Sequence, residues 1–150
     1  MLLRRDHALL DAAVATLLDL SSTEIVIARA FDELRTLFTA HVESEAIVLR
    51  AALVSAQPPP FVAFLTAQVT AAHIAQERAL DAMTTMRPAA APWRAQAERL
   101  GALMSEHADH EAASVLPALR DNLPPELFGR LATRYATVRK RALELRPSAA

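Results

Sequence analysis

The sequence contains no cysteine and only two glycines among its 150 residues. The absence of cysteine excludes disulfides, thiolate catalysis and cysteine-ligated metal sites. The scarcity of glycine and of β-branched runs, together with abundant alanine, leucine, glutamate and arginine, favours helices over strands. We therefore expect an all-α protein, and a chain of this length is most simply one domain over residues 1–150.

Long hydrophobic runs are also lacking, although 53% of the residues are hydrophobic. No run approaches the roughly 18 uninterrupted apolar residues of a membrane span. Charge begins at Arg4, too early for a secretory signal peptide, so we expect a cytoplasmic protein without a membrane partner. Sixteen basic against 17 acidic residues leave a net charge of −1, which gives no electrostatic basis for binding nucleic acid.

Apolar residues at helical spacing form long segments that end at serine- or proline-rich breaks. Four long helices with short connections favour an up-down-up-down four-helix bundle over about residues 3–120. An additional C-terminal helix is expected at about residues 125–146, packed across one end or one side of the bundle. Five unrelated helices or a helical repeat array are the alternatives. The four bundle helices are expected at about residues 3–20, 23–55, 61–86 and 93–119.

Histidine–glutamate pairs interrupt the apolar pattern in the second and fourth predicted helices. His41 and Glu45 are four residues apart, and residues at this spacing share one face of a helix. An offset of 66 residues relates this pair to a second one, and the same offset relates two further polar positions. The chain is therefore interpreted as two copies of a helical hairpin. The matched positions are His7 with His73, Asp11 with Glu77, His41 with His107, and Glu45 with Glu111.

The four histidines of this repeat are expected in one layer of the bundle. In an antiparallel hairpin, two residues lie at equal height when the midpoint of their numbers falls at the turn. The successive histidine pairs have midpoints at 24, 57 and 90, and each midpoint falls in a predicted break. Four imidazoles and two carboxylates in one cross-section need polar partners if they are buried. A transition metal would satisfy both kinds of group.

Other polar and aromatic residues are less clearly assigned. Glu77 and Asp11 could be auxiliary metal ligands, acceptors for an imidazole N–H, or solvated charges. His110 is expected beside the site or in solvent. Trp93 and Tyr135 are most simply packing residues.

The order of these motifs resembles the hemerythrin-like, or HHE cation-binding, domains. The pattern is a histidine on the first helix, His-x3-Glu on the second, a histidine on the third and His-x3-Glu on the fourth. The stretch 107–117, which ends in Val-Leu-Pro, is also similar to the fourth-helix signature of that family. The resemblance covers about residues 3–120.

This resemblance implies a non-haem di-iron centre of the Fe–O–Fe type, bridged by the carboxylates of Glu45 and Glu111. By the repeat, one iron would be served by His7 and His41, and the other by His73 and His107. Manganese or zinc could occupy the same ligands. The predicted metal ligands are His7, His41, Glu45, His73, Glu77, His107 and Glu111.

Glu77 marks a departure from the oxygen-carrying members of the family. Those proteins have a fifth ligand histidine one turn after the histidine of the third helix, where this chain has glutamate. Losing one imidazole leaves a more open or more anionic iron, which speaks against reversible oxygen carriage.

The expected function is that of a di-iron protein which binds or reacts with oxygen, nitric oxide or peroxide. One alternative is an iron or oxygen sensor, or an iron-handling module, without turnover. Another is a catalase- or NO-reductase-like enzyme. The sequence does not decide between a binding protein and an enzyme, and it does not give the oligomeric state or a redox partner.

Overall fold

The computed structural model describes residues 2–145, and every regular element in that range is helical. The all-α prediction is therefore confirmed for the described residues. The predicted end of the last helix at residue 146 lies outside them. The elements are α1 (Leu2–Leu18), α2 (Glu24–Ala56), α3 (Pro60–Thr84), α4 (Ala91–His110), the π-helical turn η1 (Glu111–Val115), α5 (Leu116–Asn122) and α6 (Pro125–Glu144).

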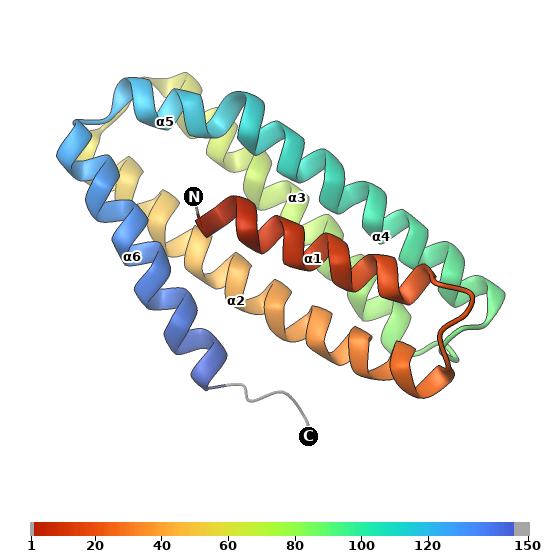
Figure 1. Ribbon diagram of the computed structural model, residues 1–150. Coiled ribbons are helices and arrows are strands. Elements are labelled where there is room, and N and C mark those ends of the chain that lie inside the picture. Colours follow the sequence, from red (N-terminus) through yellow and green to blue (C-terminus); the bar gives the residue numbers. More distant parts are fainter. Residues whose placement is uncertain (1, 146–150) are drawn as a thin grey trace.

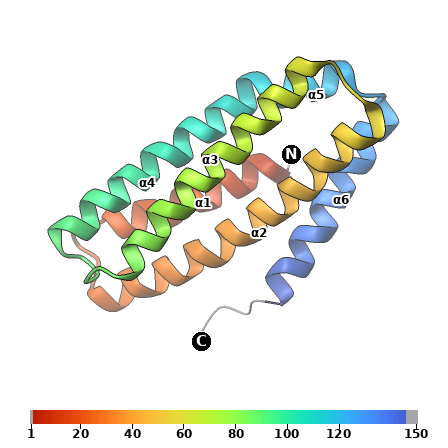
Figure 2. The same ribbon diagram turned by 180° about the vertical axis from the view of Figure 1, so that it is seen from behind.

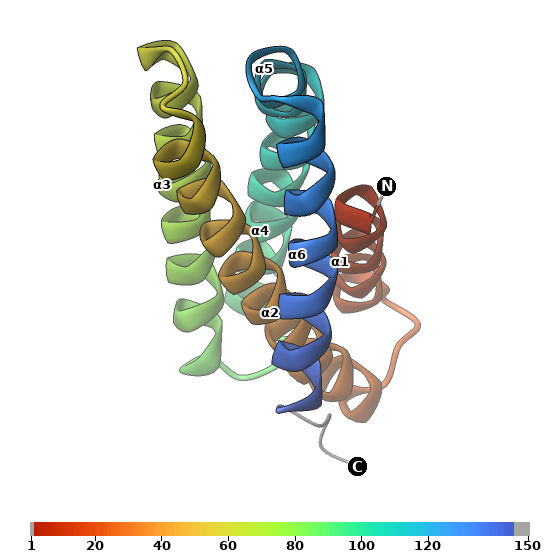
Figure 3. The same ribbon diagram turned by 90° about the vertical axis from the view of Figure 1, so that its left-hand side faces the viewer.

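The four long helices α1 to α4 lie lengthwise beside one another, and α6 leans against the outside of α2 (Figures 1 and 2). Helix α1 packs on α2 and α4, and α3 packs on α4 and less extensively on α2. Helix α1 starts part-way along the assembly, so it covers only one half of its length (Figure 1). The first turns of α6 lie beside α5 in the other half (Figure 3).

The helix boundaries follow local chemistry that is visible in the sequence. Thr23 caps α2, because its hydroxyl oxygen accepts a hydrogen bond from the backbone N–H of Val26 at 3.4 Å. Pro60 opens α3, where a missing backbone N–H costs nothing. Between these two helices, Gln57 adopts a left-handed conformation with φ 45° and ends α2.

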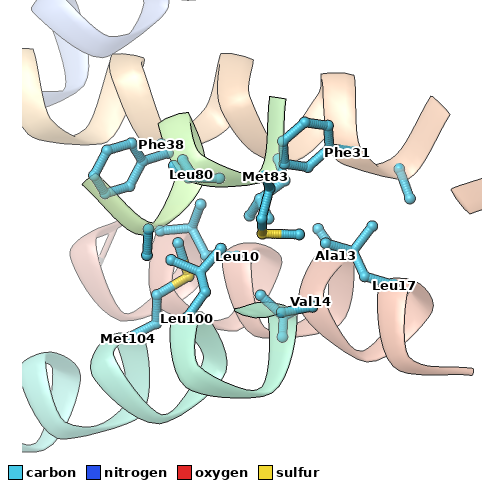
Figure 4. Close-up of a cluster of buried hydrophobic side chains, with 14 of the residues drawn as sticks. Leu10, Ala13, Val14, Leu17, Phe31, Phe38, Leu80, Met83, Leu100 and Met104 are labelled. Atoms are coloured by element: carbon cyan, nitrogen blue, oxygen red, sulfur yellow. The ribbon is translucent and has the colours of Figure 1, made fainter. Parts of the chain in front are cut away.

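Two hydrophobic clusters lie at the two ends of the helix assembly. The first joins α1, α2, α3 and α4 and includes Phe31, Met83 and Leu100 (Figure 4). It also contains the fully buried Trp93, whose ring meets that of Phe31 edge-on at 5.8 Å. The second joins α2, α3, η1, α5 and α6 and includes Val115 and Leu131. Trp93 is thus a packing residue, as predicted. The layer of polar residues lies between the two clusters.

A π-helical turn joins α4 to α5 beside Pro117. The backbone N–H of Leu116 donates to the carbonyl of Glu111, five residues earlier instead of four. Proline lacks an N–H and disturbs the turn before it, which accounts for the irregularity at this place. The turn also has a geometric effect. Four-residue steps on a regular α-helix drift by about 40° each, and the wider turn reduces this drift. His107, Glu111, Val115 and Leu119 are consequently all buried.

Candidate metal centre

Six of the predicted ligands lie close together between the two hydrophobic clusters. The closest pair of imidazole rings has centroids 4.6 Å apart, and four further pairs among the four rings have centroids 5.0–5.8 Å apart. The midpoint argument therefore placed the four histidines in one layer correctly. The contributing residues are His7 from α1, His41 and Glu45 from α2, His73 from α3, His107 from α4, and Glu111 from η1.

Three imidazoles surround the carboxylate of Glu45. Its Oε2 atom lies 3.5 Å from Nε2 of His41, 3.3 Å from Nε2 of His73 and 3.9 Å from Nε2 of His107. All four residues are buried. The helix-spacing argument explains the first contact, whereas the other two join α2 to α3 and α4.

The carboxylate of Glu111 is surrounded in a similar way by two imidazoles. Its Oε2 lies 3.1 Å from Nε2 of His7, and its Oε1 lies 3.9 Å from Nε2 of His107. Glu111 is fully buried, and the nearby carboxyl group of Glu45 affects its pKa. The two carboxyl groups therefore lie near each other in the histidine layer.

The donor set fits a metal ion by distance. One ligand atom from each of His41, Glu45, His73 and His107 lies within 4.8 Å of the other three, and the same holds for His7, His107 and Glu111. Ligands bound at about 2.0–2.2 Å from a common ion must lie within roughly 4.4 Å of one another, so small side-chain movements would close both groups.

The hydrogen-bonding state of the site fits a metal as well. Several of its buried atoms have no hydrogen-bond partner among the described residues. Such atoms are costly unless something else satisfies them. They are Nε2 of His7, Nε2 of His41, Oε2 of Glu45, Nδ1 of His107 and both carboxylate oxygens of Glu111.

The grouping differs from the division that the family resemblance implies. That division assigns His7 with His41 to one iron and His73 with His107 to the other. In the structure, His41 shares a group with His73, and His7 shares one with Glu111. His107 belongs to both groups, so its single Nε2 atom lies between the two candidate positions.

Burial sets the protonation states of the ligands. It lowers the pKa of His41 well below its usual value, lowers that of His73 to about 4, and with the nearby His73 lowers that of His107 to about 3. Burial also raises the pKa of Glu45, and burial with the adjacent Glu45 carboxyl raises that of Glu111 to about 8. Three imidazoles are therefore neutral near pH 7, as metal ligands must be.

The structure does not bring Glu77 to this site. Glu77 is exposed and belongs to neither group of candidate ligands. Gln76 takes the inward position instead, and its Nε2 donates to the carbonyl of Leu103 at 3.0 Å. Helix α3 is regular here, and its phase turns position 76, not position 77, toward the layer. Asp11 is likewise exposed.

Sequence reasoning missed three residues beside the histidine layer. The hydroxyl of Tyr135 on α6 lies 3.1 Å from Nδ1 of His41 and donates to Asp6 on α1. Arg139, one turn further along α6, donates to the same carboxylate at 2.6 Å. Asp6 and Tyr135 are buried. Tyr135 is therefore not only a packing residue, and α6 contacts the site itself.

The signals for these three residues were weak. Asp6 precedes His7 and has no counterpart in the repeat, because position 72 is alanine. Tyr135 and Arg139 are four residues apart, but they lie outside the repeated region. His110 is partly buried and lines a surface pocket together with His107.

Comparison of the chain with protein-family models, with curated proteins and with solved structures gives no match. The interpretation of the site therefore depends on its residues and their geometry. Among the described residues, no helix has the length and apolar character needed to cross a bilayer.

Proposed function

We propose that the protein binds two metal ions, most simply iron, in the histidine–carboxylate layer and uses them to bind or react with a small ligand. The observation that carries this proposal is a layer of four histidines and two glutamates, buried except for the partly buried His7, with six unsatisfied polar atoms between two apolar clusters. Without a cation, this layer would be a large unfavourable term in folding. Cations bound to the two ligand groups would give the buried ligand atoms partners.

The proposal includes a hemerythrin-like up-down-up-down arrangement of α1 to α4, with α6 as an addition. Three features support it: the order of the motifs, the meeting of one ligand layer from four helices, and the packing of α1 on α2 and α4. In such bundles, metal sites are built from inward-facing side chains on neighbouring helices.

The chain's own residues would prepare the site in three ways. Burial keeps the imidazoles of His41, His73 and His107 neutral, so that their lone pairs are available. A carboxylate has two oxygens, which suits Glu45 and Glu111 to a bridge between two ions. Bound iron would supply open coordination positions for oxygen, nitric oxide or peroxide.

A small apolar cavity favours a small ligand. It has a volume of about 70 Å³ and is lined mostly by hydrophobic side chains from α1, α2, α5 and α6. Glu45 and Tyr135 contribute its polar edge, so the cavity reaches the histidine layer directly. A volume of this size admits a diatomic molecule or peroxide, and an apolar lining holds water weakly.

The test is a metal analysis combined with visible absorption spectra before and after adding oxygen, peroxide and nitric oxide. Two irons per chain and a spectrum that changes with one of these ligands are expected. A reversible oxygen spectrum would favour carriage, and rapid loss of peroxide would favour an enzyme. Iron-loaded protein whose spectrum responds to none of the three would contradict the small-ligand part of the proposal.

A further inference from the structure

The hydrogen bonds around Tyr135 run in one direction. The carboxylate of Asp6 can only accept, and it receives bonds from the Tyr135 hydroxyl and from Nε of Arg139. The Tyr135 hydroxyl therefore donates its single proton to the hydrogen bond with Asp6.

The direction of these bonds fixes the tautomer of His41. Its Nδ1 atom lies 3.1 Å from the Tyr135 oxygen, which has lone pairs to offer but no second proton. Nδ1 must then carry the imidazole proton and donate it. A neutral imidazole has one N–H, so Nε2 keeps a free lone pair. That lone pair is directed at the candidate metal position beside Glu45.

We propose that Tyr135, held by Asp6 and Arg139, is a positioning residue that fixes His41 in its metal-binding tautomer. This inference rests on the proposed metal site and deepens it. It makes α6 part of the centre, because α6 supplies the acceptor for a ligand that belongs to α2. Outer hydrogen bonds of this kind orient ligand histidines and typically contribute 10- to 100-fold to metal affinity.

The chain supplies matched variants for a test. Tyr135→Phe removes only the acceptor hydroxyl. Asp6→Ala leaves the hydroxyl in place but frees its proton, which can then turn toward Nδ1 of His41. Thr133→Val is the control, because it deletes a hydroxyl on the same helix that is exposed and bonded only to the carbonyl of Gly129.

The first measurement uses metal-free protein labelled with ¹⁵N in histidine, with His41→Gln to assign the resonance. We expect the proton of His41 on Nδ1 in the wild type and in Thr133→Val, and a rise in the Nε2–H form in Tyr135→Phe and Asp6→Ala. Circular dichroism verifies that each variant is folded. A wild-type His41 with its proton on Nε2 would overturn the inference.

The second measurement is the affinity of the same proteins for Zn²⁺ and Fe²⁺ in a competition titration with a chelator. Tyr135→Phe should bind roughly 10- to 100-fold more weakly than wild type, with Thr133→Val unchanged. Wild-type affinity in a folded Tyr135→Phe protein would overturn the positioning role. If the wild type itself binds no metal, the proposed function fails, and the nitrogen spectrum still decides the tautomer of His41.

Discussion

The Nε2 atoms of His73 and His107 lie 3.2 Å apart in the buried layer. Burial keeps both imidazoles neutral, since it lowers the pKa of His73 to about 4 and that of His107 to about 3. At this distance one nitrogen must donate to the other, and Glu45 then competes for the same proton at 3.3 Å from His73. One proton shared among two imidazole nitrogens and a carboxylate oxygen is a poor substitute for a cation.

Metal ions should stabilise the fold strongly. A ligand that binds only the native state stabilises it by about 2.7 kcal/mol when the free ligand concentration is 100 times the dissociation constant. Adding Fe²⁺ without oxygen, or Zn²⁺, to metal-free protein should therefore raise the melting temperature by several degrees, and a chelator should reverse the change. Calorimetry measures it. If neither metal changes the melting temperature, the folded protein has no such metal site.

Glu111→Gln should separate metal binding from folding. Because the pKa of Glu111 is raised to about 8, its carboxyl group in the metal-free protein is mostly protonated at pH 7. A neutral amide of the same size should then change the free energy of unfolding by no more than about 1 kcal/mol. Metal affinity should fall sharply, because an amide is a much weaker ligand than a carboxylate. Urea unfolding and chelator competition measure the two effects.

The metal-free protein should be most stable in mildly acidic solution. His73 and His107 have lowered pKa values in the fold, so the unfolded chain binds more protons and stability falls as the pH drops below about 6.5. Glu111 has a raised pKa, so its contribution is lost as the pH rises from about 4.5 to about 8.

Below about pH 6.5 the two histidines gain more stability per pH unit than the one glutamate loses, and above it only the loss remains, so the optimum for the site's contribution lies near pH 6.5. Urea unfolding across pH 4 to 8.5 tests this, with the double variant His73→Ala and Glu111→Gln as the control, which should show a flatter profile. A wild-type profile as flat as that of the variant would contradict the protonation states assigned to the layer.

Neighbouring positions on α3 should respond differently to substitution. Glu77→Ala should keep its metal and its stability, because Glu77 is exposed and outside both ligand groups. Gln76→Ala should lower stability by about 1–3 kcal/mol, because its buried amide satisfies the carbonyl of Leu103. Metal analysis and thermal unfolding compare the two variants. Loss of metal from Glu77→Ala would show that Glu77 moves inward when metal is bound.

Much of the helical arrangement and of the ligand layer could be predicted from the sequence, because both depend on short-range rules. Prolines and the cap at Thr23 mark the helix ends, and the 66-residue repeat with its midpoints brings His7, His41, His73 and His107 together. These rules use only spacing along one helix or symmetry about one turn.

The remaining features depend on packing that spacing does not reveal. Whether Gln76 or Glu77 faces inward depends on the phase of α3, and three or four residues fit one turn almost equally well. The contact between Tyr135 and His41 joins residues 94 positions apart and requires the path of α6 across α2. No repeat or midpoint relates α6 to the other helices.

The most direct test of the central claim is the metal content of the double variant His73→Ala and Glu111→Ala beside that of the wild type. Both proteins are loaded with Fe²⁺ without oxygen, desalted and analysed by mass spectrometry of the metal. We expect about two irons per chain in the wild type, as a bridged pair requires. The folded double variant should retain little or no iron. Equal iron in the two proteins would show that the histidine–carboxylate layer is not the metal site.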